Sequence, residues 1–586
     1  MSHIRLSLPD YLVVAGYFVI VFWIGFYFRN RLAGAKDYFA GGNRIPWWLA
    51  GISHYMSSFS AFSFVAYAQM GYTYGWVAVT LFWATIPGCL LGGIIFARRW
   101  RRARVITPVQ FLESRFNGFV RQLFAWAGIP MRIFDNALKI FATALFVGVL
   151  VNINLKGAIV ICGVAMVAYT YLGGLWALVV TDYVQFLMKM LAIVLLLPLA
   201  VVACGGVVTA YRELPEGFFH LSNGPYSWIY IAGFTVLMII SYNASWSLAQ
   251  KYYSVRDEKE ASKAAYCAAA LNFLGAPLMI LPAVLGRHFL PDLLAQNRTA
   301  DVYVLLVVNL LPVGMIGIIV AAMLSATMAV VSADFNAIAS VLTKDVYQRL
   351  IRPSASERQL LLIGRWATLT LGVLTTLLSL WISIMHQEAL FNTMVTVLGL
   401  FMAPTFLPLL AGLTVRRLTW QGAFSGFAAG LTTGLVMLAI KTWWMPQHSG
   451  GPLDSGYDFE GFSLLANTVV TVLGMIAGTR LSSPTPEDKT RIKDFFALLD
   501  KPVQPEEMTG PKGNPSAPAL RLSTYSVAGL LILAGILSGS TIARTIDVGV
   551  GAVLIVVAVL FYRKESRDAL DLTSQGSYKE ESIHAR

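Results

Sequence analysis

The 586-residue chain has little charge, because only 13% of its residues are Asp, Glu, Lys or Arg while 57% are hydrophobic. Soluble domains carry about 25% charged residues, so this composition excludes an ordinary soluble enzyme. Intrinsic disorder is excluded more firmly, since disordered chains are poor in apolar residues. The remaining interpretation is a protein whose surroundings are mostly lipid.

Residues that build disulfide frameworks or metal centres are also scarce. The four cysteines lie inside apolar stretches, which indicates small core residues; they are Cys89, Cys162, Cys204 and Cys267. Of only seven histidines, His54 alone lies deep in an apolar run. The absence of a G-x-x-x-x-G-K-[ST] loop disfavours an ATP-driven pump, and no cleavable signal peptide is evident.

Long apolar runs are what the sequence has in abundance. About fifteen stretches suit a helical crossing of roughly 20 residues. They begin near residues 9, 46, 76, 120, 155, 176, 228, 265, 303, 361, 390, 420, 461, 524 and 545. The runs are too long and continuous for the alternating strands of a membrane barrel, so we expect an all-α polytopic membrane protein.

The net charge of +13 predicts an orientation. Basic residues gather in loops, such as residues 98–104 and 489–501, that share one side if every run crosses once, whereas the loop 445–461 contains no Lys or Arg. The positive-inside rule then places the N-terminus outside and the C-terminal tail in the cytoplasm, for a multi-pass protein of the cell membrane. The excess of basic residues therefore indicates how the chain is oriented in the membrane. We expect no nucleic-acid partner.

A few ionisable residues remain inside the apolar runs, where they are costly and mark pathways or paired sites. They are His54, Arg132, Asp135, Lys139, Asp182, Lys189 and Asp334. Asp135 and Lys139 are one helical turn apart, so they can neutralise each other or face a solute. Structural pairing between helices is the alternative for each of these residues.

Two stretches are typical of interrupted helices. Residues 57–63 contain four serines, and an unwound turn there would expose carbonyls to a cation or solute, although a small-residue packing face is the alternative. Gly173-Gly174 opens the sixth run, in which Asp182, Gln185 and Lys189 share one helical face. Lys189 lies roughly 10 Å along the axis from Asp182, so we expect no tight pair between them.

Four motifs follow one another in a characteristic order. They are Gly41-Gly42-Asn43-Arg44-Ile45-Pro46-Trp47-Trp48, Gly173-Gly174 with Thr181-Asp182-x-x-Gln185, Asn336 with Asp345-Val346-Tyr347, and Val415-Arg416-Arg417-Leu418-Thr419-x-x-Gly422-Ala423. Together they resemble the sodium/solute symporter family, which includes transporters of sugars, sialic acid, proline and monocarboxylates. The resemblance runs from about residue 9 to 482.

The resemblance implies the leucine-transporter-type fold, a five-plus-five inverted repeat with one extra N-terminal and about four extra C-terminal helices. It implies the following segments: 1–45, a first helix and cytoplasmic loop; 46–205 and 228–414, the two repeats; 415–482, two more helices; 483–522, a cytoplasmic linker; 523–562, a helical hairpin; and 563–586, a cytoplasmic tail. Alternating access would come from rocking of one bundle against the other around a midplane site.

The family's sodium site would be altered in this chain. The resemblance implies carbonyl ligands at Met56, Phe59 and Ala326, but the two hydroxyl ligands align with Ala329 and Val330. Neither of these side chains can bind sodium. We expect no cofactor, with sodium or a proton as the coupling ion.

A second cation position, found in part of the family, would retain Asp182 and Ser332 here but is incomplete. Lys189 stands where the family carries an apolar residue, at the depth of the altered sodium site. We hypothesise that its ammonium replaces the sodium ion, which would make transport proton-coupled or facilitative. In the alternative, Lys189 pairs with Asp334 or Asp135.

The positions that bind galactose in sugar transporters of the family carry other residues here. The family's Glu, Lys and Gln align with Phe82, Asn272 and Val395. The serines of the broken helix correspond better to the sialic-acid branch, which binds a carboxylate. The expected substrate-binding residues are Ser58, Ser60, Ser63, Phe82, Asp135, Lys139, Tyr242, Asn243 and Asn272.

The sequence thus predicts a secondary active transporter of a small polar organic solute, a sodium:solute symporter by resemblance. Its expected partners are the solute and the lipid bilayer, and we expect a monomer or simple homo-oligomer. A sodium-independent transporter is the alternative, and a channel is a further one. A membrane enzyme is disfavoured because no acid/base or metal constellation is evident, and a sensor because the tail is short.

Overall fold

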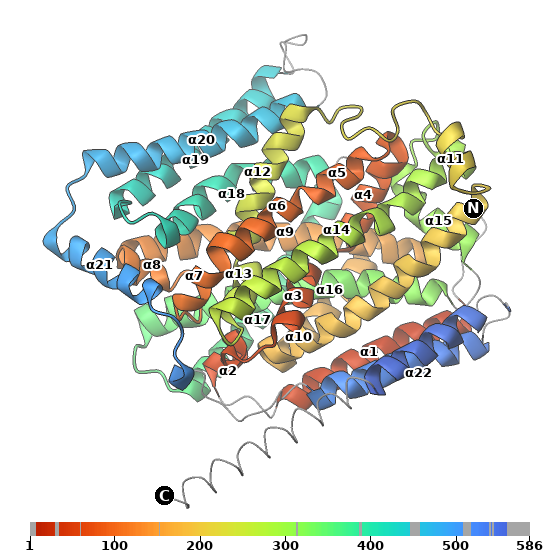
Figure 1. Ribbon diagram of the computed structural model, residues 1–586, viewed down its shortest axis with the longest axis horizontal. Helices are drawn as coiled ribbons and strands as arrows, with labels where there is room; N and C mark the ends of the chain where they lie inside the picture. The colour runs from red at the N-terminus through yellow and green to blue at the C-terminus, as the bar shows by residue number, and fades with distance from the viewer. Residues whose placement is uncertain are drawn as a thin grey trace, which may run out of the picture.

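The computed structural model describes residues 7–29, 34–58, 60–151, 153–311, 315–385, 390–445, 457–507, 517–537, 541 and 544–559. Within these ranges the regular secondary structure is helical (Figure 1). Ten described helices are long and apolar enough to cross a membrane, or eleven if one bent pair counts as a single span. The predicted ligand Phe59 and the predicted tail 563–586 lie outside the described residues.

Short and broken segments account for much of the difference from the fifteen predicted crossings. The run near residue 155 is a short helix, Leu155–Tyr171. The run near residue 303 contains another short helix, Thr299–Leu310, and the long helix begins only at Ile316, after a Pro312-Val313-Gly314 sequence. The run near residue 46 is divided into two helices. Length alone therefore could not separate spans from shorter elements.

The predicted first repeat, residues 46–205, begins with the helix pair that the serine-rich stretch interrupts. Its helices are α3 (Trp47–Met56), α4 (Ala61–Tyr74), α5 (Val77–Trp83), α6 (Thr85–Leu91), the π-helical η2 (Gly92–Phe96), α7 (Ala97–Arg102), α8 (Phe111–Arg115), α9 (Gly118–Val151) and α10 (Leu155–Ala203). The short α2 (Ala35–Ala40) and η1 (Gly41–Asn43) precede it, and α11 (Val207–Glu213) follows it. The predicted interruption of the helix over residues 57–63 is confirmed, since α3 ends at Met56 and α4 begins at Ala61.

The predicted second repeat, residues 228–414, also begins with two helices joined at a bend. Its elements are α12 (Trp228–Ala244), α13 (Trp246–Tyr253), α14 (Glu258–Phe289), η3 (Pro291–Leu293), η4 (Thr299–Asp301), α15 (Val302–Leu310), α16 (Ile316–Val341), the π-helical η5 (Leu342–Ile351), α17 (Glu357–Met385) and α18 (Leu390–Thr414). The bend between α12 and α13 is 49°. Broken helices therefore stand at the start of both predicted repeats.

The remaining helices pack on the outside of this core. They are α1 (Leu8–Arg29), α19 (Trp420–Ala439), η6 (Ile440–Trp444), α20 (Asp458–Leu481), α21 (Pro486–Asp500), η8 (Pro505–Glu507) and α22 (Ala517–Leu537). The first and last of the labelled helices, α1 and α22, lie side by side along one edge, while α19 and α20 cover the opposite edge (Figure 1). At Gly16 of α1 a Cβ atom would lie 2.5 Å from Leu530 of α22, so this glycine permits the close approach.

The predicted glycine turn before the sixth run is confirmed as a kink inside α10. Gly174 has φ +56°, a conformation that glycine adopts without steric cost. A Cβ atom there would lie 2.7 Å from the Tyr38 ring and 3.0 Å from the Tyr38 carbonyl oxygen. The kink separates Leu155–Tyr171 from the long apolar segment Gly174–Ala203.

The centre of the molecule is α16, whose residues from Gly317 to its end are all buried. It packs against α1, α9, α10 and α17, and its position in the middle of the helices is visible in Figure 1. Because it faces protein rather than lipid, α16 can hold polar side chains such as Ser332, Asp334 and Asn336 inside the span.

The predicted linker 483–522 contains a helix of its own, α21. Thr485 and Asp488 form a capping box at its start, and Pro486 occupies the first helical turn, where its missing N–H is no loss. We call residues 485–507 the strap, because they lie across one end of the helices (Figure 1). The polar composition that predicts a linker also suits a helix lying outside the membrane.

The strap is held by ion pairs and by aromatic packing. The Arg104 guanidinium donates to both carboxylate oxygens of Glu507, at 2.6 and 2.9 Å, and Phe495 stacks on Phe111 of α8 with ring centres 5.8 Å apart. The Arg416–Asp500 pair, at 2.8 Å, joins the strap to the turn after α18. The strap thus joins the end of α7 to α8 and to the turn between α18 and α19.

Candidate functional site

A polar cavity of about 120 Å³ lies where both broken helices meet the centre of the fold. Its walls come from the α3–α4 break, from α4, α5 and α6, from α9, from α12 and α13, and from α16 and α18. Cavities between helices at broken segments are typical solute sites in transporters. This cavity is our candidate site.

The serines of the first break line the cavity. The chain at Ser60 is extended, with φ −108° and ψ 172°, and the Ser63 amide donates to the Ser60 carbonyl at 2.9 Å. The Ser58 hydroxyl donates to the Tyr55 carbonyl at 2.7 Å, which satisfies one of the carbonyls left at the end of α3. Ser57, Ser58, Ser60 and Ser63 are all in the cavity wall.

The second break is one that the sequence analysis did not predict. Ser245 has φ −54° and ψ 130°, outside the helical region, and both Ser245 and Ser247 line the cavity. The available signal was the cluster Ser241, Asn243 and Ser245, which is similar to the serine run of residues 57–63. That cluster contains no glycine or proline and lies in a continuous apolar run, so it gave no clear signal for the end of a helix.

Four charged side chains form a network in the cavity wall. Lys139 contacts the Asp135 carboxylate at 2.7 Å, and Arg132 contacts it at 3.5 Å. Asp334 of α16 lies across from them, 3.6 Å from the Lys139 ammonium and 3.7 Å from the Arg132 guanidinium. Asp135 and Lys139 thus form the mutual pair that was one of the two predicted alternatives, and both side chains line the cavity.

Other residues support this network. The Arg132 guanidinium donates to the Ser245 hydroxyl at the second break, and its carbon lies 5.5 Å from the centre of the Phe406 ring. Neither oxygen of Asp334 has a hydrogen-bond partner of ordinary geometry among the described residues, although Ser247 and Asn136 lie beside it. Buried carboxylates normally accept several hydrogen bonds. Asp334 is therefore held mainly by its ion pairs with Arg132 and Lys139.

Seven of the nine expected substrate-binding residues line this cavity. They are Ser58, Ser60, Ser63, Phe82, Asp135, Lys139 and Tyr242. Asn243 and Asn272 are not among the described residues of its wall: the Asn243 amide donates to the Gly88 carbonyl at 2.9 Å, and the Asn272 amide donates to the Ala268 carbonyl at 2.8 Å. Asn243 thus joins α12 to α6, whereas Asn272 bonds to the backbone of its own helix α14.

The cavity also contains aromatic and hydroxyl residues that the sequence analysis left out. Tyr67, one turn after Ser63, packs its ring edge against Phe82 with centres 5.2 Å apart, and Thr85 lies near them. The helical spacing of Tyr67 from Ser63 was the signal that could have found it. Thr85 gave no comparable signal.

Lys189 is fully buried beside the end of α3. Its ammonium nitrogen lies 4.0 Å from the centre of the Tyr55 ring, and Tyr55 packs in one cluster with Met56 and Ala329. Met56 and Ala329 are two of the positions implied for the sodium site. The two carboxylates considered as alternative partners of Lys189, Asp135 and Asp334, pair with Arg132 and Lys139.

The hydroxyls of α16 near the implied sodium site are engaged in other hydrogen bonds. Ser325 donates to the Ala322 carbonyl at 2.7 Å, and Ser332 donates to the Met328 carbonyl. The Thr327 hydroxyl accepts from Thr143 of α9 at 2.7 Å. Val330 lines the solute cavity, and Ala326 is buried in the middle of α16.

Asp182 occupies a separate buried position on α10. Its carboxylate accepts a hydrogen bond from Ser53 of α3, and the buried Lys251 of α13 is the cation whose charge acts on it. On the same face of α10, the Gln185 amide donates to the Tyr17 hydroxyl of α1 at 3.1 Å. Asp182 and Ser332, the two residues implied for the second cation position, thus bond to other partners: Asp182 to Ser53, and Ser332 to the backbone of its own helix.

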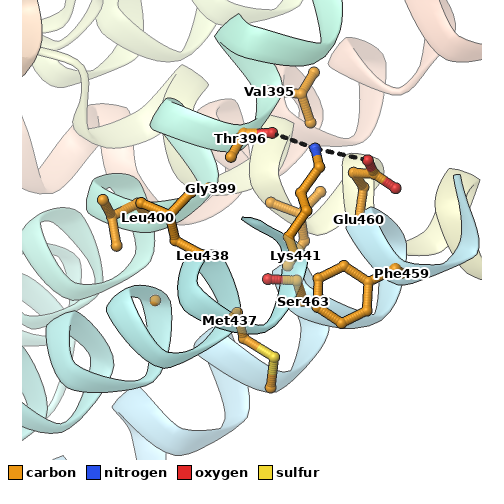
Figure 2. Close-up of a pocket in the computed structure, with 12 residues that line it drawn as sticks. Val395, Thr396, Gly399, Leu400, Met437, Leu438, Lys441, Phe459, Glu460 and Ser463 are labelled. Carbon is orange, nitrogen blue, oxygen red and sulfur yellow. Dashed lines mark hydrogen bonds and ion pairs between the residues drawn. The ribbon is translucent and has the colours of Figure 1, made fainter. Parts of the chain in front are cut away.

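A second, smaller pocket of about 30 Å³ lies among α18, α19, η6 and α20 (Figure 2). Lys441 stands between Thr396 and Glu460, with its ammonium 2.9 Å from the hydroxyl and 2.8 Å from the carboxylate. This volume suits about two water molecules. Among the described residues, no group of three or more His, Cys, Asp or Glu side chains could hold a metal ion.

The sequence matches the model of a family described as the Sodium:solute symporter family over residues 38–430. The sodium/sialic acid symporter NanT of Aliivibrio fischeri is 27% identical over 454 residues, which cover 73% of this chain and 87% of that protein. The sodium/glucose cotransporter 2 of Rattus norvegicus is 26% identical over 483 residues, which cover 73% of this chain and 71% of that protein.

Among solved structures, a Na⁺-coupled sialic acid symporter in a substrate-bound outward-open state aligns with a TM-score of 0.71. The alignment covers 82% of this chain and 98% of that structure at 22% identity. This likeness confirms the predicted leucine-transporter-type inverted repeat.

Helices broken around a buried polar cavity are typical of secondary membrane transporters. The chain belongs to the sodium:solute symporter family.

Proposed function

We propose that the chain is a secondary active transporter that binds a small polar organic solute in the cavity between its two broken helices. Alternating access would expose this cavity first to one side of the membrane and then to the other, as one helix bundle rocks against the other. The proposal is supported by the breaks at residues 57–60 and at Ser245, which both border the cavity. Unwound segments supply polar backbone and hydroxyl groups where continuous helices would not.

We further propose that the Lys189 ammonium replaces the sodium ion of the family. The observation that carries this proposal is the position of Lys189 over the Tyr55 ring, in contact with the cluster that contains Met56 and Ala329. Ala329 and Val330 cannot supply hydroxyl ligands, and Ser325 and Ser332 donate within α16. A fixed cation at that point would hold the broken helix to its neighbours as a bound sodium would.

Symport with sodium is the second candidate, and Asp182 favours it. The relatives named above are sodium symporters, and a buried carboxylate is retained at the position of a second cation. Under this candidate, Asp182 would bind sodium or carry a proton. The two candidates differ in whether sodium ions stabilise the protein.

Sodium binding can be measured without knowing the solute. The melting temperature of the purified chain in detergent would be compared in NaCl and in choline chloride at the same ionic strength. A ligand at one hundred times its Kd stabilises by about 2.7 kcal/mol, so a bound sodium would raise the melting temperature. We expect no sodium-specific shift in the wild type. A sodium-specific shift in the wild type would contradict the proposal and favour symport with sodium.

A variant that rebuilds the implied sodium site is the matched comparison for Lys189→Ala. Lys189→Ala combined with Ala329→Ser and Val330→Ser restores the two hydroxyls and removes the ammonium. We expect this triple variant to gain a sodium-specific shift, whereas Lys189→Ala alone gains none. Uptake into proteoliposomes with sodium and proton gradients imposed separately would then identify the coupling ion of the wild type.

A further inference from the structure

We propose that the strap, residues 485–507, is a latch between two sets of helices that move apart during transport, and that its grip on Arg104 is the contact that releases. This inference rests on the proposed function, because alternating access requires such a movement. It adds the contact that restrains the movement at the end of the molecule where the strap lies. Its basis is the different chemistry of the strap's contacts with the two sets, together with the backbone conformation of Arg104.

The first set of helices consists of α7 and the start of α14. The Arg101 guanidinium of α7 donates to the Val255 carbonyl at 2.8 Å and to the Arg256 carbonyl at 2.9 Å, in the short connection that leads into α14. Arg102 pairs with Glu258, the first residue of α14, at 2.9 Å. These charged hydrogen bonds join α7 and α14 into one unit at this end.

The second set consists of α8, the start of α9, η5 and the turn after α18. The Glu113 carboxylate of α8 contacts Arg121 of α9, and it contacts Arg349 of η5 at 2.6 Å. Arg121 also pairs with Asp345 of η5. The Arg115 guanidinium of α8 donates to backbone carbonyls at the end of α18 and just after it. These four elements therefore form a second unit.

Buried aromatic side chains anchor the strap to the second set. Phe495 and Phe496 of α21 are only 3% and 5% exposed. Phe495 stacks on Phe111 of α8, and the Phe496 ring centre lies 5.3 Å from the guanidinium carbon of Arg115. Burial of large apolar side chains contributes more to stability than an exposed ion pair does. We therefore expect α21 to stay on α8 when single charged contacts are lost.

Polar contacts join the other end of the strap to the first set. Arg104 follows the end of α7, and its guanidinium donates to both carboxylate oxygens of Glu507 and to the Leu498 carbonyl. The Arg102 guanidinium donates to the Leu499 carbonyl at 3.3 Å. The Arg104 and Glu507 side chains are 21% and 35% exposed, so water can solvate both groups when the pair opens. This end of the strap is therefore the one that can release (Figure 1).

The backbone of Arg104 indicates where the chain bends between the two sets. Its φ of +54° lies in the left-handed region, which is unfavourable for a residue with a side chain. Arg104 stands in the connection between α7 and α8, so it links the two sets along the chain. Strained residues persist where their contacts hold them, and they are frequent in switch segments. Release of its side chain by Glu507 would allow this backbone to relax.

The experiment measures the distance between the two sets in the full-length chain, reconstituted in lipid nanodiscs. Spin labels are attached at Lys259→Cys of α14 and Leu350→Cys of η5, both exposed positions outside the strap, in a background whose four native cysteines are replaced by alanine. Pulsed electron paramagnetic resonance then gives the distribution of distances. A label at Gln504→Cys, in separate samples, reports the mobility of the strap itself.

We expect Glu507→Lys to free the strap and to raise the population with a longer distance between the sets by about fivefold or more, the effect of losing and reversing one charged contact. Glu506→Lys is the matched control, because it makes the same change of charge at the exposed neighbouring position. It should leave both the distance distribution and the strap mobility as in the wild type.

The inference is overturned if the strap becomes mobile in Glu507→Lys while the distance distribution stays that of the wild type. It is also overturned if the strap stays immobile in that variant, or if Glu506→Lys has an equal effect. Where Glu507→Lys does not fold, Glu507→Gln provides the same comparison.

Failure of the latch and failure of the proposed function are distinguishable. The distance measurements need neither a solute nor an ion gradient. An absence of uptake into proteoliposomes would count against the proposed transporter, whereas unchanged distances with a mobile strap would count against the latch alone.

Discussion

The ammonium of Lys189 lies 4.0 Å from the centre of the Tyr55 ring, at the end of α3 where the helix breaks. A cation over an aromatic face is attracted by the negative charge of the π-system. This contact links α10, which carries Lys189, to the part of α3 that borders the break. It connects the buried lysine physically to the candidate transport site.

The first prediction concerns this contact. Tyr55→Leu should destabilise the protein by more than Tyr55→Phe, because Phe keeps an aromatic face and Leu does not. The cation–π part of the difference should amount to about 0.5–2 kcal/mol. Chemical denaturation in detergent would measure it.

A double-mutant cycle provides the control for the Tyr55 prediction. In a Lys189→Met background the difference between Tyr55→Phe and Tyr55→Leu should shrink to the packing contribution alone. An unchanged difference would mean that the ring acts by packing, without an interaction with the ammonium.

The second prediction concerns the kink at Gly174. Gly174→Ala should lower the stability by at least about 1 kcal/mol, because a left-handed conformation is unfavourable for alanine. The new Cβ would also lie 2.7 Å from the Tyr38 ring. Gly529→Ala is the matched control, since a Cβ there has open space and α22 is helical, so its melting temperature should equal or exceed that of the wild type. Equal stability of the two variants would contradict the assigned role of the kink.

The third prediction concerns Arg115, which is buried at the end of α8. Its guanidinium donates to the carbonyls of Gly412, Val415 and Leu418, at 3.1, 2.9 and 2.7 Å, and so holds the turn between α18 and α19. Arg115→Lys keeps the charge but cannot form this fork. We expect a loss of about 2–4 kcal/mol in unfolding free energy.

The neighbouring Arg416 offers a comparison for Arg115→Lys. Arg416 is exposed and pairs with Asp500 at 2.8 Å, and exposed pairs contribute little. Arg416→Lys should therefore leave the melting temperature nearly unchanged. A similar loss in both variants would indicate that the buried fork of donors at Arg115 does not account for the effect.

The fourth prediction concerns the strap. Hydrogen bonds from Arg104 hold the pKa of Glu507 below its ordinary value. The contribution of this pair is therefore complete above the ordinary glutamate pKa of about 4.3 and is lost as the pH falls through the lowered value. Mobility of a spin label placed on the strap at Gln504→Cys should be low at pH 7 and should rise only below about pH 4.

Substitution of Glu507 tests whether its pair with Arg104 holds the strap. Glu507→Gln should raise the label mobility at pH 7 and speed tryptic cleavage within the strap. Glu506→Gln, at the exposed neighbouring position, should change neither measurement. A strap that stays immobile in Glu507→Gln would show that its other contacts, the Phe495–Phe111 stack and the Arg416–Asp500 pair, suffice to hold it.

Much of the fold could be predicted from the sequence because a bilayer restricts helices strongly. The long apolar runs predicted membrane helices, and the serine run at residues 57–63 predicted the first break. The second break, at Ser245, was missed because only serine and asparagine mark it. The helix α21 was missed because its polar surface resembles a linker, although Thr485 and Asp488 with Pro486 form a start signal.

The candidate site could be predicted only in part. Asp135 and Lys139 are four residues apart on one helix, so their pairing follows from helical spacing. Asp334 is almost two hundred residues away, and its approach to Lys139 depends on how α16 packs against α9. Asn243 and Asn272 occupy the expected helices, but their amides bind backbone carbonyls and not the cavity. Which partner an amide binds depends on local packing, and the sequence alone does not give that packing.

The pairing of α1 with α22 has a consequence for biosynthesis. Gly16 and Leu530 meet across these helices, although about 500 residues separate them in the chain. At about 5–20 residues per second, the ribosome completes α22 roughly 25–100 s after α1. During this interval lipid must cover the face of α1 that α22 later occupies. The helix α1, which precedes the other described helices in the chain, is therefore among the last to acquire all of its protein neighbours.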